Sequence, residues 1–238
     1  MKTLICISGH LRKYENYIEK FRNQILNPIS KISQYDIIIS TWHKRNTDKC
    51  LSVRVDWKRA YSGLEDNIVN LESLYDYLNP LTIEIENQHQ FSLDYSHKMQ
   101  MNHRAATKFG DGKAFWWMYM FYKIWRCSQL VDFNKYDYAV RCRIDAFPKK
   151  EIEWNDLFDE NIHIPFLEIN GQPFAFDMFW MGPIHQMYET FQFYLHYEKV
   201  IDLCYSPIPE IAFHTWLMTL KDKISIKEGT LPEFSKEF

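Results

Sequence analysis

The chain has 238 residues, a net charge of −3, and 46% hydrophobic and 17% aromatic residues, but only 7 glycines. This composition excludes collagen-like, low-complexity and largely disordered chains, and the length predicts one domain with a substantial core. No run of basic residues is present, so we expect no nucleic-acid partner. The 5 cysteines lie far apart and form no CxxC pair, which predicts reduced, buried thiols in a cytoplasmic protein.

Two buried strands with a helix between them are predicted first. Residues 3–8 (TLICIS) and 35–41 (YDIIIST) are short runs rich in β-branched residues. Between them, apolar residues recur at helical spacing over residues 15–26, and we expect Pro28 to end that helix. Strands that are apolar on both faces are typical of a parallel sheet covered by helices, so the pattern predicts an α/β fold.

The following segments predict a sheet edge and then a loop. We expect a helix over residues 64–78, stopped by Asn79 and Pro80, and an alternating edge strand over residues 81–86 (LTIEIE). Residues 87–112 show no periodicity, and an irregular stretch of this length is usually functional. Its basic side chains suit a diphosphate, unless the loop is simply solvated. They are His97, Lys98, His103, Arg104 and Lys108.

The C-terminal half is predicted to be α+β. The expected helices cover residues 113–131, 184–203 and 209–221, and the expected strands cover residues 136–143, 162–165, 174–181 and 224–226. The longest apolar stretch, residues 114–124, is interrupted by Lys123 and is too short to cross a membrane. The apolar run after Lys2 is also too short for a signal peptide, so we expect neither feature.

Ligands of open α/β sheets bind beyond the carboxyl ends of the strands, so strand ends are the candidate sites. After the first strand, Ser8 and Gly9 let the backbone approach a ligand, and Arg12 suits an anion. The alternative is a tight turn with a surface arginine. At the second strand end, Thr41 and Trp42 offer a hydroxyl and an aromatic face to a nucleoside or sugar. The alternative is a helix cap followed by a packed indole.

The end of the strand over residues 136–143 is the most informative of these sites. Arg141 and Arg143 alternate in an otherwise apolar strand, and Asp145 continues the same face. Two buried arginines are costly unless anions meet them. Those anions could be carboxylates, which gives an internal ion pair, or a ligand diphosphate. Asp145 could also hold a divalent metal that bridges such a diphosphate.

Six segments in this order resemble one enzyme family. They are residues 7–12 (ISGHLR), 36–42 (DIIISTW), 117–130 (WMYMFYKIWRCSQL), 136–145 (YDYAVRCRID), 176–182 (FDMFWMG) and 209–210 (PE). Together they resemble motifs of GT-A-type glycosyltransferases from capsular and lipopolysaccharide gene clusters, and of related viral glycosyltransferases. The similarity spans residues 4 to about 217.

The resemblance implies a GT-A fold, which is Rossmann-like with a mixed, mostly parallel central sheet flanked by helices. Residues 1–238 would form a single domain, with a nucleotide-binding half over residues 1–145 and an acceptor-side half over residues 146–238. The implied reaction transfers a sugar from a nucleotide-diphosphate sugar to a glycan acceptor in surface polysaccharide synthesis. With the reduced thiols expected above, we place the protein in the cytoplasm, including the periphery of a membrane.

The resemblance also raises the question of a metal. GT-A enzymes usually carry an Asp-x-Asp motif that binds Mn²⁺ or Mg²⁺ and the donor diphosphate, whereas this chain has Arg143, Ile144 and Asp145 at the corresponding positions. Asp145 could hold the metal with help from elsewhere, and His214 is a candidate ligand unless it is a packed helical histidine. Alternatively, Arg143 replaces the metal by pairing with the diphosphate directly.

An inverting transferase also needs a carboxylate as general base. Asp177 and Glu210 are the candidates, and we favour Asp177 because it lies among aromatic residues, where an acid is costly to bury. Either carboxylate could instead serve as a cap or an ion-pair partner. A retaining enzyme would need no such base.

Two other classes of function stay open. A non-catalytic protein that binds nucleotide sugars or carbohydrates on the same fold would explain the altered Asp-x-Asp motif. A methyltransferase would be expected to have a glycine-rich turn after its first strand, where this chain has Gly9 alone. A phosphohydrolase would need several aspartates near one strand end, where only Asp145 is so placed.

Overall fold

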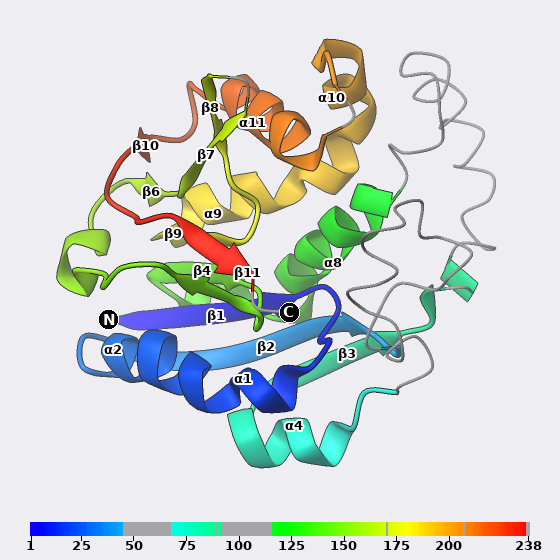
Figure 1. Cartoon of the computed structure of the whole chain (residues 1–238), viewed down its shortest axis with the longest axis vertical. Helices are drawn as coiled ribbons and strands as arrows, with labels where there is room; N and C mark the ends of the chain where they lie inside the picture. Colours follow the sequence, from blue (N-terminus) through cyan, green and yellow to red (C-terminus); the bar gives the residue numbers. More distant parts are fainter. Residues whose placement is uncertain (45–67, 89, 92–115, 170, 207, 237–238) are drawn as a thin grey trace.

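The computed structural model describes residues 1–44, 68–88, 90–91, 116–169, 171–206 and 208–236. A central sheet is covered by helices on both faces, which makes three layers (Figure 1). The helices are α1 (Tyr14–Phe21), α2 (Asn27–Ser30), α4 (Leu71–Leu78), α8 (Trp116–Leu130), α9 (Ile184–Phe191), α10 (Tyr197–Leu203) and α11 (Pro209–Thr219). The described residues also form a π-helix, η1 (Arg22–Leu26), and three 3₁₀ segments, η4 (Phe133–Lys135), η5 (Trp154–Leu157) and η6 (Gln192–His196).

Within the described residues, the main sheet has seven strands in the order β10-β6-β9-β4-β1-β2-β3. They are β1 (Lys2–Ser8), β2 (Gln34–Trp42), β3 (Thr82–Glu86), β4 (Tyr138–Cys142), β6 (Ile162–His163), β9 (Phe179–Pro183) and β10 (Ile226–Lys227). The first four are parallel, β6 is parallel to β10, and β9 runs antiparallel to both β4 and β6. The prediction of a mixed α/β fold with a large, mostly parallel sheet is therefore confirmed, as is the place of β3 at the sheet edge.

Two smaller sheets complete the described strands. One pairs β5 (Ala146–Pro148) with β11 (Phe234–Lys236), and the other pairs β7 (Phe166–Ile169) with β8 (Gln172–Ala175). Neither of these two strand pairings was predicted from the sequence. No helix among the described residues is both long and apolar enough to cross a lipid bilayer.

The core consists of two hydrophobic clusters, one on each face of the sheet. Along β1, Leu4 and Cys6 join the cluster beneath α8, α9 and α11, while Ile5 and Ile7 join the cluster beneath α1 and α4. This alternation follows from the two-residue period of a strand. The described cysteines are free and buried, as predicted, whereas Cys50 lies outside the described residues.

Two predicted helix boundaries are wrong. The first helix does not end at Pro28, because the chain continues through η1 and α2 to Ser30, with the proline in the first turn of α2, where no N–H is needed. The helix expected over residues 64–78 begins only at Leu71. The side chain of Asn70 caps it by accepting a hydrogen bond of 3.2 Å from the Ser73 N–H. Residues 64–67 of that prediction lie outside the described residues.

The predicted C-terminal elements are more broken than expected. The helix over residues 184–203 is three segments, α9, η6 and α10. The strand over residues 174–181 is also wrong, because β8 ends at Ala175 and β9 begins at Phe179 in a different sheet. Asp177 therefore lies in the turn between two strands rather than on a strand. The central strand β4 ends at Cys142, so Arg143 lies just beyond it.

Gly182 marks a close approach between two strands, and its substitution gives a first prediction. A Cβ atom there would lie 2.9 Å from the Ile162 Cα and 3.0 Å from the Asn161 carbonyl oxygen, which are backbone atoms that cannot turn aside. We expect Gly182→Ala to lower the free energy of unfolding by about 1–3 kcal/mol, measured by urea denaturation. A variant as stable as the wild type would contradict the close β6–β9 packing.

Candidate functional site

The carboxyl ends of β1, β2, β3 and β4 lie along one side of the main sheet, because these strands are parallel. We call this side the carboxyl edge of the sheet. The antiparallel strand β9 begins at the same edge, opposite the end of β4. The residues predicted from three separate strand ends are thereby brought together. They are Ser8, Gly9, Arg12, Thr41, Trp42, Arg141, Arg143 and Asp145.

Asp145 lies in the turn after β4 and binds two arginines. Its Oδ1 accepts a hydrogen bond of 2.8 Å from Arg143 Nε, and its Oδ2 accepts bonds of 2.7 Å from both Arg143 Nη2 and Arg12 Nη1. The carboxylate side chain is 1% exposed, and the arginine side chains are 6% (Arg12) and 12% (Arg143) exposed. The internal Arg–Asp ion pair, one of the two interpretations left open by the sequence, is thus present.

Arg141 is fully buried and bonds to a different set of groups. Its Nε donates a hydrogen bond of 3.0 Å to the Ser8 hydroxyl, and its Nη1 donates to the backbone carbonyl of Asp177. Its guanidinium carbon lies 5.0 Å from the ring centroid of Trp180, an arrangement typical of a cation–π contact. Arg141 and Arg143 therefore do not share one anion: Arg143 forks onto Asp145, and Arg141 is fixed beside Asp177.

Buried polar atoms without partners occur at this point. Arg141 Nη2 and Asp177 Oδ1 are both buried and have no hydrogen-bond partner among the described residues. Asp177 as a whole is only 4% exposed. Because a buried carboxylate oxygen without a donor is costly, an acceptor is held open here within the described structure.

Burial and the carboxylates at the carboxyl edge shift the pKa values of Arg141 and Arg143. Burial alone would lower the pKa of Arg143, but the carboxylates of Asp145, Asp177 and Glu210 raise it above its ordinary value. Burial lowers the pKa of Arg141, against the attraction of Asp177. Both base candidates therefore lie close enough to Arg143 to interact with it, although Asp177 is in the β8–β9 turn and Glu210 is in the first turn of α11.

The first two strand ends are fixed by their own hydrogen bonds. Gly9 has a φ of 99°, which favours glycine, and its N–H donates to the Ser40 carbonyl at 3.1 Å. The Thr41 hydroxyl donates to the Gly9 carbonyl at 2.8 Å, so it joins the two strand ends. Trp42 is 1% exposed and lies 5.8 Å, centroid to centroid, from the stacked ring of Tyr122. The packed-indole alternative is thus confirmed for Trp42.

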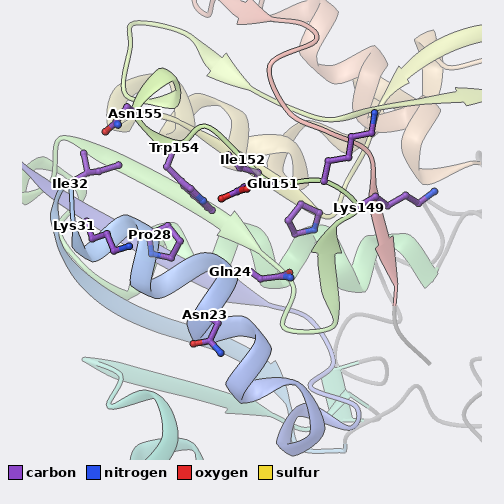
Figure 2. A pocket seen from close by; sticks show the side chains of 12 residues that line it. Asn23, Gln24, Pro28, Lys31, Ile32, Lys149, Glu151, Ile152, Trp154 and Asn155 are labelled. Atoms are coloured by element: carbon purple, nitrogen blue, oxygen red, sulfur yellow. The ribbon is translucent and has the colours of Figure 1, made fainter.

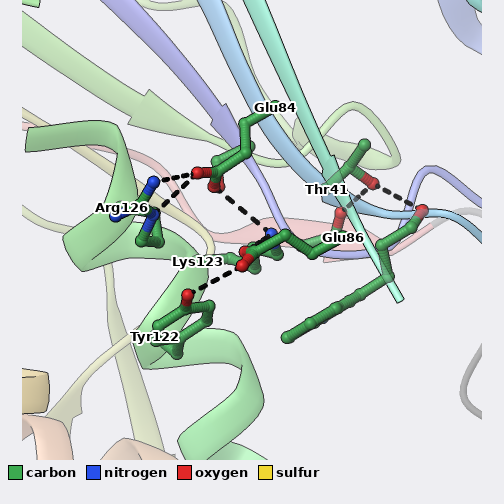
Figure 3. Close-up of polar contacts among 9 residues, drawn as sticks. Thr41, Glu84, Glu86, Tyr122, Lys123 and Arg126 are labelled. Carbon is green, nitrogen blue, oxygen red and sulfur yellow. Dashed lines mark hydrogen bonds and ion pairs between the residues drawn. The ribbon is translucent and has the colours of Figure 1, made fainter. Parts of the chain in front are cut away.

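A second charged cluster at the carboxyl edge was not predicted from the sequence (Figure 3). It consists of Lys123, Arg126, Glu84 and Glu86. Lys123 of α8 has a fully buried side chain, and its Nζ bonds to Glu86 and lies 3.3 Å from Glu84. Glu84 also accepts a 2.7 Å bond from Arg126 Nε, and Glu86 accepts a 2.9 Å bond from the Tyr122 hydroxyl. Burial raises the pKa of Glu84, but its cationic partners and the Ser40 hydroxyl lower it overall.

The sequence did contain a signal for this cluster. Lys123 interrupts an apolar helix, where an uncharged residue would be expected, and Glu84 and Glu86 alternate along an edge strand, which places them on one face. Their pairing joins elements that are far apart in the chain, which no local pattern specifies. The Lys123 Nζ also lies 4.4 Å from the ring centroid of Trp42, so it covers the indole that was expected to stack on a ligand.

The donor set at Asp145 does not fit a divalent cation. Both carboxylate oxygens already accept N–H donors from arginines, whose positive charge would repel a metal. His214 is packed against aromatic rings, with ring centroids 5.4 Å from Phe174 and 6.3 Å from Phe166. No group of three His, Cys, Asp or Glu side chains suited to a metal occurs in the part of the chain that the structure describes.

His10 provides a pH-dependent contribution to stability. Its Nδ1 lies 3.2 Å from the Lys44 carbonyl oxygen. Burial lowers its pKa from 6.5 to about 4, against the effect of that hydrogen bond, and the charges of Arg143 and Lys123 lower it further. Between these two pH values the unfolded chain binds a proton that the folded chain does not, so the free energy of unfolding falls as the pH falls.

The matching prediction compares the wild type with His10→Gln. From pH 7 to pH 5, we expect the wild type to lose about 1–2 kcal/mol more of its free energy of unfolding than the variant, because only the wild type carries this titrating group. Urea denaturation at the two pH values measures the difference. The same pH dependence in both proteins would contradict a His10 that stays neutral in the folded protein over this pH range.

The arrangement at this edge combines anion-binding and proton-accepting groups. Three arginines, Arg12, Arg141 and Arg143, face carboxylates that balance their charge, and an entering phosphate could replace or add to those anions.

The basic residues predicted between positions 97 and 108 lie outside the described residues. In comparisons with known proteins, the chain matches no protein-family model and no curated sequence.

Proposed function

We propose that the chain is a glycosyltransferase with a GT-A-like site that transfers a sugar from a nucleoside-diphosphate sugar to a glycan acceptor. The observation that carries the proposal is the meeting of Arg12, Arg141 and Arg143 with Asp145 and Asp177 at the carboxyl edge of a parallel sheet. Sugar transfer needs a group that stabilises the leaving diphosphate and a group that takes the acceptor's proton. This edge offers both.

In this proposal, Arg12 and Arg143 bind the diphosphate of the donor. A guanidinium has five N–H donors in a fixed fork, and Asp145 engages only two of the three nitrogens of Arg143. Asp145 thus holds the guanidinium in position, and N–H groups of Arg143 can still meet phosphate oxygens. Donors that are oriented before the reaction stabilise developing charge without reorganisation. In this proposal the arginines take the place that the Asp-x-Asp metal has in other GT-A enzymes.

In this proposal, Asp177 is the general base that accepts the proton of the acceptor hydroxyl. Its Oδ1 is buried without a hydrogen-bond partner among the described residues, so it offers an acceptor in a water-poor environment. Arg141, anchored on the Asp177 carbonyl and on Ser8, fixes the turn that carries this carboxylate. Glu210 is the second candidate, because its charge also acts on Arg143.

The test is isothermal titration with UDP-, GDP- and dTDP-sugars, each in EDTA and in Mn²⁺. We expect at least one donor to bind in EDTA as tightly as in Mn²⁺, and more tightly than a CMP-sugar, which has a single phosphate and serves as the matched ligand control. Arg143→Lys keeps the charge but loses the bidentate fork, so its affinity should fall by about tenfold or more. Failure of every donor to bind would refute the proposal, and binding only with Mn²⁺ would refute the metal-free assignment.

A non-catalytic binding protein is the second candidate function. It is favoured by the full occupation of Asp145 by arginines, since an ion pair of this kind is also a structural element. Donor hydrolysis separates the two functions. Slow release of free nucleoside diphosphate from a bound donor supports the enzyme, whereas tight binding with no release and no transfer supports the binding protein.

A further inference from the structure

A groove of about 700 Å³, lined by both polar and apolar side chains, lies on the face of the sheet that α1 covers. One wall is the helical run formed by η1 and α2, and the other is the segment that follows β5 and leads into η5 (Figure 2). Its volume falls within the range typical of small-molecule sites. The residues that line it are Asn23, Gln24, Pro28, Lys31, Ile32, Pro148, Lys149, Lys150, Glu151, Ile152, Trp154 and Asn155.

The groove is separate from the arginine site but close to it. Lys149 follows Asp145 by four residues, so the two are at most about 14 Å apart along the chain. None of the groove residues belongs to the set around Arg12 and Arg143. A ligand in this groove would therefore occupy a second site.

The hydrogen-bonding groups in the groove suit a ligand rich in hydroxyls. The amides of Asn23, Gln24 and Asn155 offer both donors and acceptors, and Glu151 offers a carboxylate. Gln24 extends from its helix toward the segment that carries Lys149 (Figure 2). Its Oε1 is buried and has no hydrogen-bond partner among the described residues, so a buried acceptor in the groove wall awaits a donor.

The charges favour an anionic group on that ligand. Lys149 is already paired with Glu233 at 2.7 Å, but Lys31 and Lys150 form no ion pair among the described residues. Trp154 is only 8% exposed and packs its edge against Phe179, so it offers little ring surface to stack a nucleobase.

We propose that this groove binds an acidic saccharide, with Lys31 and Lys150 each on a separate carboxylate or phosphate group and the amides and Glu151 on its hydroxyls. The site does not depend on the transferase activity. If the proposed transfer also holds, the groove takes a remote unit of an acidic glycan acceptor.

The experiment is isothermal titration of the full chain with tetragalacturonate and with its methyl ester, which has the same skeleton without the charge. We expect the acid to bind at least tenfold more tightly than the ester. The double variant Lys31→Glu, Lys150→Glu should lose at least tenfold in affinity for the acid, whereas Lys221→Glu, at an exposed position beyond α11, should not. Inorganic phosphate alone, and a phosphorylated oligosaccharide, show which anion the lysines prefer.

Gln24→Leu is a second variant, chosen because it should weaken binding without destabilising the fold. Removing a buried acceptor that has no partner should leave the thermal stability of the free protein unchanged or higher, while affinity for the acid falls several-fold. Equal binding of acid and ester, unchanged affinity in the double lysine variant, or binding of phosphate as tight as that of the saccharide would overturn the proposal. The nucleotide-sugar titration tests the arginine site separately, so the two proposals can fail independently.

Discussion

Replacing Asp177 with Asn should lower kcat for sugar transfer by about 10²- to 10⁴-fold and leave donor affinity nearly unchanged, if Asp177 is the general base. Asparagine has almost the same shape but cannot accept a proton. The donor diphosphate is assigned to Arg12 and Arg143, which Asp177 does not hydrogen-bond. A loss in kcat without a loss in donor affinity therefore separates proton transfer from donor binding. Donor affinity is measured by titration and kcat by release of nucleoside diphosphate at saturating acceptor.

Glu210→Gln is the matched comparison for this prediction, since Glu210 is the other base candidate whose charge acts on Arg143. A full kcat in Asp177→Asn together with a large loss in Glu210→Gln would move the base to α11. A full kcat in both variants would contradict a side-chain base altogether and would favour a retaining mechanism. Asp222→Asn, on the exposed turn after α11, provides the control for nonspecific effects of losing an acidic group.

Replacing Asp145 with Ala should lower the free energy of unfolding by about 3–5 kcal/mol, because it leaves two nearly buried guanidiniums without their shared anion. From sequence alone this substitution is expected to abolish transfer and leave the fold intact. The ion pairs with Arg12 and Arg143 change that expectation, so activity measured on Asp145→Ala must be read together with its stability. Urea denaturation of the wild type and the variant measures the difference.

The control is Asp222→Ala, an exposed carboxylate whose loss should change stability by less than about 0.5 kcal/mol. A nucleoside diphosphate should partly restore the stability of Asp145→Ala, because it supplies an anion to the arginines that have lost Asp145. If Asp145→Ala loses less than about 1 kcal/mol, the two ion pairs contribute little, and the arginines are held by other contacts.

The N-terminal half of the fold could be predicted because its signals are local. The runs that became β1 and β2 are apolar on both faces, and their alternating residues feed two separate core clusters as a covered parallel strand requires. The candidate site followed from this, since parallel strands bring their carboxyl ends to one edge. Arg12 and Asp145 therefore meet although 133 residues separate them.

The rest of the site could not be predicted because it depends on contacts between distant segments. The run from Phe174 to Met181 is apolar enough for one strand, but β8 pairs with β7 outside the main sheet, so the chain turns at Asp177. In the same way, nothing local shows that Lys123 of α8 lies over Trp42 of β2. The ring expected to stack on a ligand is covered by a helix that lies far along the chain.

The central claim is that arginines at the carboxyl edge of the sheet hold the diphosphate of a nucleotide sugar. A crystal structure with a bound nucleoside-diphosphate donor, grown in the presence of Mn²⁺, tests it most directly. We expect phosphate oxygens within hydrogen-bond distance of the Arg12 and Arg143 guanidiniums, with both arginines still bonded to Asp145 and no metal between Asp145 and the diphosphate. A metal that bridges Asp145 and the diphosphate, or a donor bound away from these arginines, would contradict it.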